Sequence, residues 1–176
     1  MRSAFALAVA IGVAAPIVAP AVAAADDGVR GTDKGNFGVG IILGEPTGIT
    51  AKLYLKDDVA VQGAVGSAFI GGGLQLHADY VFHPYILQSR DSFVLPVYFG
   101  PGVRVIDYTS GRNDPSGAST SAFALGARGV AGLLFDFKTV PLDAFIEVAA
   151  VLEYEFRSGA GFALRLNAGA GVRYYF

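Results

Sequence analysis

The stretch that decides the fold is residues 161–176, GFALRLNAGAGVRYYF, at the end of the sequence. Every second residue from Phe162 onward is apolar, whereas the intervening positions include Arg165, Asn167 and Arg173. Because successive side chains of a β-strand point to opposite faces, the stretch is predicted to be a strand with one wholly apolar face. This pattern is typical of a strand that has hydrocarbon outside it and a polar lumen inside it.

The same alternation resembles the C-terminal strand of bacterial outer-membrane β-barrels, in which a terminal Phe follows apolar residues at every second position. The matching positions in this chain are Ala168, Ala170, Val172, Tyr174 and Phe176. The resemblance implies that the outer-membrane assembly machinery reads this strand as its signal. It also implies that outer-membrane lipid surrounds the folded chain.

A second resemblance covers the middle of the chain. Residues 41–53 (IILGEPTGITAKL) and 76–83 (LHADYVFH) are similar to a family of small, functionally uncharacterised bacterial outer-membrane barrels of the eight-stranded OmpA/OmpX/OmpW-like kind. Together with the C-terminal motif, this resemblance spans most of the mature chain. It implies a fold and an outer-membrane location, and it carries no activity.

The N-terminus has the features of a cleaved secretory signal peptide over residues 1–25. Arg2 supplies the positive charge, an apolar run follows, and small residues allow cleavage after Ala23 or Ala25. The polar, glycine-rich residues 26–35 (DDGVRGTDKG) are then predicted to form a flexible leader. The chain is therefore expected to be exported to the outer membrane.

The barrel domain is predicted to be residues 36–176, which contain eight alternating segments separated by turn signals. After the signal peptide no apolar run is long enough for a membrane-spanning helix. An even strand count is the rule for closed bacterial barrels, so we expect an all-β, eight-stranded antiparallel up-and-down transmembrane β-barrel. Residues 84–91 are predicted to be a connector, and Pro96 and Pro101 favour a bulge in the strand that follows it. The predicted strands are residues 36–43, 47–56, 59–69, 74–83, 92–106, 121–137, 142–156 and 161–176.

Aromatic residues of the apolar faces are predicted to gather at the two ends of the barrel, as the aromatic girdles of membrane barrels do. Phe99 alone is expected at mid-height. A soluble, lipocalin-like barrel is the alternative, in which the faces are inverted and aromatic residues fill the interior. The predicted girdle residues are Phe37, Tyr80, Phe82, Phe93, Phe135, Phe137, Tyr174 and Phe176 at the periplasmic end, and Phe69, Phe123, Tyr154, Phe156 and Phe162 at the outer end.

Nine titratable residues are predicted to point into the lumen. The interior of an eight-stranded barrel is just wide enough for side chains to fill, and buried charges must be paired. We therefore expect a salt-bridged network that largely closes the lumen, with a narrow conduit for small solutes as the alternative. Within it, Glu153 and Arg165 should meet, because they lie nearly opposite each other across the turn at Ser158-Gly159. The nine residues are Lys52, His77, Asp79, Arg104, Arg128, Glu147, Glu153, Arg165 and Arg173.

Catalysis and cofactor binding are not predicted. His77 and Asp79 share one face of a strand, but the sequence shows neither a third metal ligand nor a nucleophile matched to them. Some outer-membrane barrels modify lipid A with a Ser and a His, so a lipid-modifying enzyme is the second alternative. No Ser stands two places from either histidine, and we expect a structural or surface-interaction barrel that is not an enzyme.

The remaining predictions concern partners. Without the signal peptide the chain carries 12 basic and 15 acidic residues, a net charge of −3 that argues against nucleic acid as a partner. There is no cysteine, which excludes disulfides and thiol chemistry. Residues 107–120 form the longest predicted loop. Its residues Arg112, Asn113 and Asp114 are the candidates for contact with an extracellular ligand.

Overall fold

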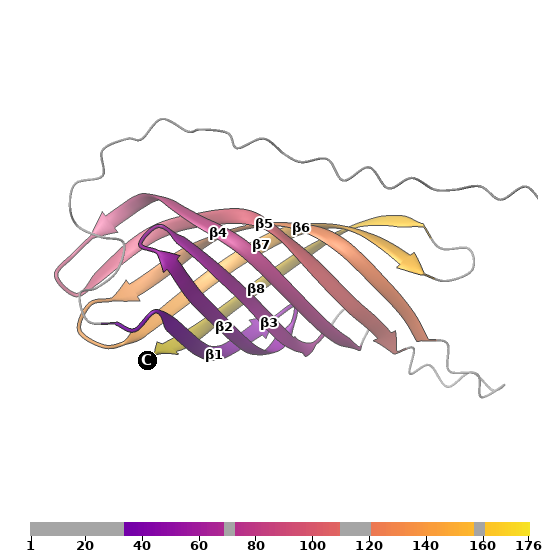
Figure 1. Cartoon of the computed structure of the whole chain (residues 1–176), viewed down its shortest axis with the longest axis horizontal. Helices are drawn as coiled ribbons and strands as arrows, with labels where there is room; N and C mark the ends of the chain where they lie inside the picture. Colours follow the sequence, from indigo (N-terminus) through magenta and orange to yellow (C-terminus); the bar gives the residue numbers. More distant parts are fainter. Residues whose placement is uncertain (1–33, 69–72, 110–120, 157–160) are drawn as a thin grey trace, which may run out of the picture.

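The fold is a single antiparallel sheet closed into a barrel (Figure 1). The computed structural model describes residues 34–68, 73–109, 121–156 and 161–176. Each strand pairs with the next along the chain, and β1 also pairs with β8, from Gly38 opposite Tyr175 to Gly44 opposite Gly169. This confirms the predicted all-β fold of eight antiparallel, up-and-down strands. The strands are β1 (Phe37–Gly44), β2 (Thr47–Lys56), β3 (Val59–Ser67), β4 (Leu74–Ser89), β5 (Phe93–Thr109), β6 (Ser121–Phe137), β7 (Leu142–Phe156) and β8 (Phe162–Tyr175).

The predicted connector at residues 84–91 is wrong, because β4 continues to Ser89. Proline cannot donate to a strand ladder, and the β4–β5 ladder adapts through register shifts between Phe82 and Tyr85, on either side of Pro84, and between Ile86 and Gln88. Those irregularities lie in β4, whereas the bulge was expected in β5. β5 also continues three residues beyond its predicted end, and β3 ends two residues before its own. The predicted signal peptide and residues 26–33 lie outside the described residues.

The two faces of the sheet have opposite chemistry. On the outside, large apolar side chains are exposed, such as Val148 at 62% and Leu166 at 76%. On the inside, charged side chains are buried, and Lys52 and Arg173 are each only 1% exposed. Long charged side chains are almost never fully buried in proteins unless they are paired. The inverted faces of the lipocalin-like alternative are not those of this barrel.

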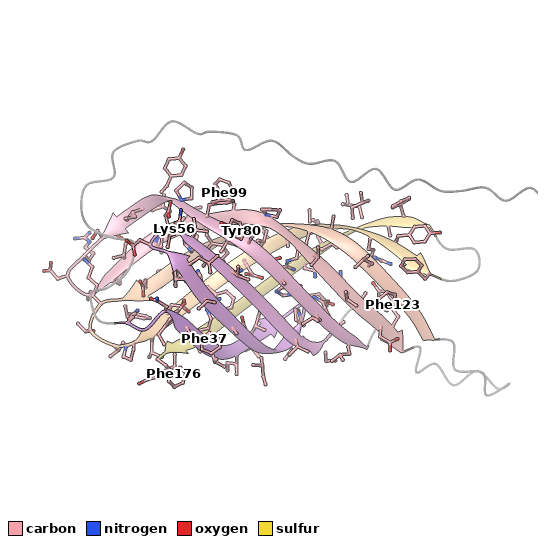
Figure 2. All side chains as sticks on the ribbon, viewed as in Figure 1. Phe37, Lys56, Tyr80, Phe99, Phe123 and Phe176 are labelled. Carbon is pink, nitrogen blue, oxygen red and sulfur yellow. The ribbon has the colours of Figure 1, made fainter. Side chains whose placement is uncertain are left out.

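Outward-facing aromatic residues cluster near both ends of the barrel. We call the end that holds Phe37 and Phe176 the terminal end, and the opposite end, toward Phe123, the loop end (Figure 2). Phe99 was expected at mid-height. It lies instead opposite Phe82, toward the terminal end, because β5 is long and the strands tilt. No helix in the described parts of the chain is long and apolar enough to cross a membrane. Ring pairs with centroids 5.0–6.3 Å apart are Tyr80–Phe82, Phe93–Phe135 and Tyr174–Phe176 toward the terminal end, and Phe123–Phe156, Tyr154–Phe156 and Tyr154–Phe162 toward the loop end.

Large side chains share the lumen with the charges. Glycines on the inner face make room for two of them: a Cβ at Gly132 would lie 2.4 Å from the ring of Tyr98, and one at Gly38 would lie 2.8 Å from the ring of Tyr175. An added methyl group at either position would therefore collide with a buried ring. The interior is thus filled by aromatic and aliphatic groups as well as by ion pairs. The main apolar cluster is Ile42, Tyr54, Ala60, Ala64, Val81, Tyr98, Val130, Leu134, Phe145, Ala149 and Tyr175.

Candidate functional site: the lumen charge network

Eight of the nine titratable residues predicted for the lumen are buried inside the barrel. The exception is Arg165, whose side chain is 43% exposed near the loop end. All nine lie on strands, which place them at alternate positions of the inner face. The eight buried residues are Lys52 on β2, His77 and Asp79 on β4, Arg104 on β5, Arg128 on β6, Glu147 and Glu153 on β7, and Arg173 on β8.

At the centre of the network, Arg128 joins carboxylates from two other strands. Its Nε donates to Asp79 Oδ2 at 3.2 Å and lies 3.0 Å from Oδ1 of the same carboxylate, and its Nη2 donates to Glu147 Oε1 at 2.6 Å. His77 adjoins the same group, with Nε2 at 3.8 Å from Asp79 Oδ2. Charge-assisted bonds of this kind are the strong ones in proteins, and here they tie β6 to its neighbour β7 and to β4, two strands away around the barrel.

Glu147 also accepts hydrogen bonds from side chains of β3 and β5. The Tyr98 hydroxyl donates to Glu147 Oε2 at 2.8 Å, and Gln62 Nε2 donates to the same oxygen at 3.0 Å. Both oxygens of this buried carboxylate therefore have partners, as buried polar groups in proteins usually do.

A second group lies at the terminal end. Arg173 Nε donates to Asp143 Oδ1 at 3.0 Å, and the Tyr175 hydroxyl donates to Asp143 Oδ2 at 2.6 Å. The guanidinium of Arg173 also stacks over the ring of Phe145, 4.1 Å from its centroid. Ionic and aromatic contacts together fill the lumen at this level.

Lys52 is held by an imidazole and two aromatic rings. Its Nζ lies 2.8 Å from His83 Nε2, and the Tyr54 and Tyr98 ring centroids are 4.8 Å and 5.0 Å away. His83 Nδ1 lies 3.2 Å from the backbone oxygen of Asp58. With the ring proton on Nδ1 donated to that oxygen, Nε2 is free to accept from the ammonium.

The third group lies toward the loop end. Arg104 Nη1 is 3.5 Å from Glu153 Oε2, and its Nη2 is 3.9 Å from Glu45 Oε1. Arg165 binds two carboxylates, through Nε to Glu153 at 2.9 Å and through Nη2 to Glu155 at 3.1 Å. The predicted contact between Glu153 and Arg165 is thus present. It is diagonal, since Glu153 is opposite Ala163 in the ladder and Arg165 is two residues further along β8.

Sequence reasoning left several members out of the network. Gln62, His83, Tyr98 and Asp143 all occupy inner-face positions, so the parity of their strands could have found them. Glu45 belongs to the turn between β1 and β2. The period-two pattern of a strand does not predict the direction of a side chain in a turn, so the sequence could not assign Glu45 to the lumen.

The structure describes the end of the predicted leader but not the predicted external contacts of the long loop. Lys34, from the predicted leader, forms an ion pair with Asp136 and lies over the ring of Tyr175, 5.8 Å from its centroid. The end of the leader is therefore attached to the barrel. The predicted external contacts Arg112, Asn113 and Asp114 lie outside the described residues.

Comparisons of the chain with protein-family models, with curated proteins and with solved structures find no match. The functional argument therefore rests on the two faces of the barrel and on the contacts inside it.

The contact between Glu153 and Arg165 gives a double-mutant prediction. Glu153→Ala should lower the free energy of unfolding by about 3 kcal/mol, because Glu153 is buried and also accepts from Tyr108 at 2.9 Å. Arg165→Ala should cost less, about 1 kcal/mol, since 43% of its side chain is exposed to solvent. The double variant should cost less than the sum, by roughly 0.5–1 kcal/mol. Urea unfolding in detergent measures all three, and strict additivity would contradict an energetic coupling.

Proposed function

We propose that this chain is an integral outer-membrane β-barrel, exported by a cleaved signal peptide, with a largely closed lumen. Its role is structural or one of surface interaction, without catalysis. The observation that carries the proposal is the distribution of polarity: apolar side chains cover the outside, and charged side chains fill the inside.

The outer face supports a lipid environment. Thirty-three large apolar side chains of the described residues are exposed, and all but two of them lie on the strands, with every strand represented. Each Å² of apolar surface left in water costs about 25 cal/mol, and soluble monomers rarely expose apolar patches larger than a few hundred Å². A bilayer removes this cost. The aromatic clusters near both ends match the interfacial girdles of membrane barrels.

The inner face supports a closed lumen. Arg173, Tyr98 and Lys52 are the three largest fully buried side chains of the described residues, and all three project inward. Side-chain contacts also reach across the lumen, from Gln62 on β3 to Glu147 on β7 and from Arg104 on β5 to Glu45 in the turn between β1 and β2, so the interior is bridged as well as lined. A barrel of eight strands has an interior that side chains can fill.

Fractionation and gel mobility test the membrane location. In a bacterial host with an outer membrane, the mature chain should be recovered in the outer-membrane fraction. Unboiled and boiled samples should migrate differently on a gel, because the folded barrel resists the detergent. Recovery as a soluble periplasmic protein would overturn the proposal.

Planar-bilayer recording tests the closed lumen separately. The refolded barrel should produce no discrete conductance steps, because side chains block the path. Reproducible single-channel steps would replace the closed lumen with the narrow conduit for small solutes. An altered mass of lipid A on overexpression, lost in His77→Ala, would instead indicate a lipid-modifying enzyme.

A further inference from the structure

We propose that His77, Asp79 and Glu147 form a binding site for one divalent metal ion in the lumen. One potential ligand atom from each residue lies within 4.8 Å of the other two, and all three side chains are buried. Atoms bound at 2.0–2.2 Å to a tetrahedral ion lie roughly 3.4 Å apart, so small side-chain rotations would complete the site. The site depends on the closed barrel itself and not on where the barrel resides.

His77 is the ligand that distinguishes this cluster from an ordinary salt bridge. It is 3% exposed, and its Nδ1 has no hydrogen-bond partner. Its Nε2 faces Asp79 Oδ2 at 3.8 Å, which is too long for a hydrogen bond and suits two ligands of one ion. Nε2, and not Nδ1, is therefore the nitrogen placed to bind the ion, and a neutral imidazole nitrogen is the commonest metal ligand in proteins.

The cluster also has an ordered outer shell. Tyr98 and Gln62 both donate to Glu147 Oε2, and the guanidinium of Arg128 contacts both carboxylates. Hydrogen bonds of this kind orient the carboxylates that bind metals and are part of such sites. Arg128 supplies a single positive charge to two carboxylates, which leaves one negative charge over.

The charge of the surrounding lumen favours a divalent cation. Among the described residues of the central and loop-end groups alone, and with every group counted as ionised, five buried carboxylates face three guanidiniums, a net charge of 3 − 5 = −2. One divalent ion balances that charge without displacing an arginine. The carboxylates are Glu45, Asp79, Glu147, Glu153 and Glu155, and the guanidiniums are Arg104, Arg128 and Arg165.

The ligand set selects the class of ion. One imidazole nitrogen with two carboxylate oxygens suits Zn²⁺, Co²⁺ or Ni²⁺. Ca²⁺ and Mg²⁺ prefer ligand sets made of oxygen alone. We therefore expect zinc-like ions to bind and calcium not to bind.

Metal retention by the refolded, untagged chain tests the proposal. The barrel is refolded in detergent with Zn²⁺, separated from excess metal by gel filtration, and analysed by atomic mass spectrometry. The wild type should retain about one Zn²⁺ per chain, the stoichiometry of a single site. His77→Gln should fall to the background of a sample refolded without metal.

His83→Gln is the matched control. The chain has only two histidines, and His83 contacts Lys52 and the backbone of Asp58, outside the cluster. This variant should retain Zn²⁺ like the wild type. Tyr98→Phe keeps all three ligands and removes one outer-shell hydrogen bond, so Zn²⁺ affinity should fall about 10-fold. The heat-dependent shift in gel mobility shows which variants are folded.

A measurement on the wild type covers the case in which His77→Gln does not fold. Co²⁺ bound by a nitrogen and carboxylates gives a visible absorption band and shifts the ring protons of its histidine in nuclear magnetic resonance spectra. One shifted histidine, with the other unchanged, supports the site. No retained metal in the folded wild type, or equal retention in folded His77→Gln, would overturn it. Neither result affects the outer-membrane proposal, which fractionation tests, and a soluble location would leave the metal measurement valid.

Discussion

Arg128→Met should lower the free energy of unfolding of the barrel by about 3–5 kcal/mol. The substitution leaves Asp79 and Glu147 facing each other in the lumen without the guanidinium that contacts both. Methionine fills a similar volume, so the loss is mainly electrostatic and not that of a cavity. Urea unfolding of the metal-free barrel in detergent, followed by gel mobility, measures the change.

Arg165→Met is the control for this prediction. Arg165 also contacts two carboxylates, but 43% of its side chain is exposed. Solvent screens its charge, so the cost should be about 1 kcal/mol or less. An equal cost for the two variants would mean that water reaches the centre of the lumen, which would contradict a closed interior.

Val148→Arg should lower the stability of the barrel in a lipid bilayer by about 2–4 kcal/mol. Val148 lies in the middle of β7, points outward, and is 62% exposed. Its neighbours across the ladders are Ala131 and Ala168. In water an exposed apolar side chain can become arginine at a cost within about 0.5 kcal/mol, whereas in hydrocarbon the new charge must be desolvated. Unfolding by urea in lipid vesicles therefore distinguishes the two environments.

Ser92→Arg provides the comparison for that variant. Ser92 lies in the exposed turn between β4 and β5 at the terminal end, beyond the aromatic cluster, so the same new charge should have almost no effect. If Val148→Arg were as neutral as Ser92→Arg, the outer face of the barrel would not lie in hydrocarbon.

The amino-acid sequence by itself determined the strands and the side of the sheet on which most residues lie. Alternation with period two is a local property, because each strand residue turns its side chain to the face opposite that of its neighbour. Hence Arg104, Glu147 and Arg173 could be assigned to the interior without knowledge of any partner strand. The predicted connector was wrong at residues 84–89. Proline cannot donate a backbone hydrogen bond, but the ladder between β4 and β5 accommodates Pro84 through register shifts, so the strand continues.

Only the tertiary structure decided which inward residues meet. Glu147 and Asp79 lie 68 positions apart on β7 and β4, and both contact Arg128 on β6 because of the strand register and the closure of the barrel. Those are properties of the whole sheet: a register shift of one residue would turn every side chain of a strand to the other face. For the same reason, His77 and Asp79 showed no third ligand in the sequence, and Glu147 completes the cluster only when the sheet closes.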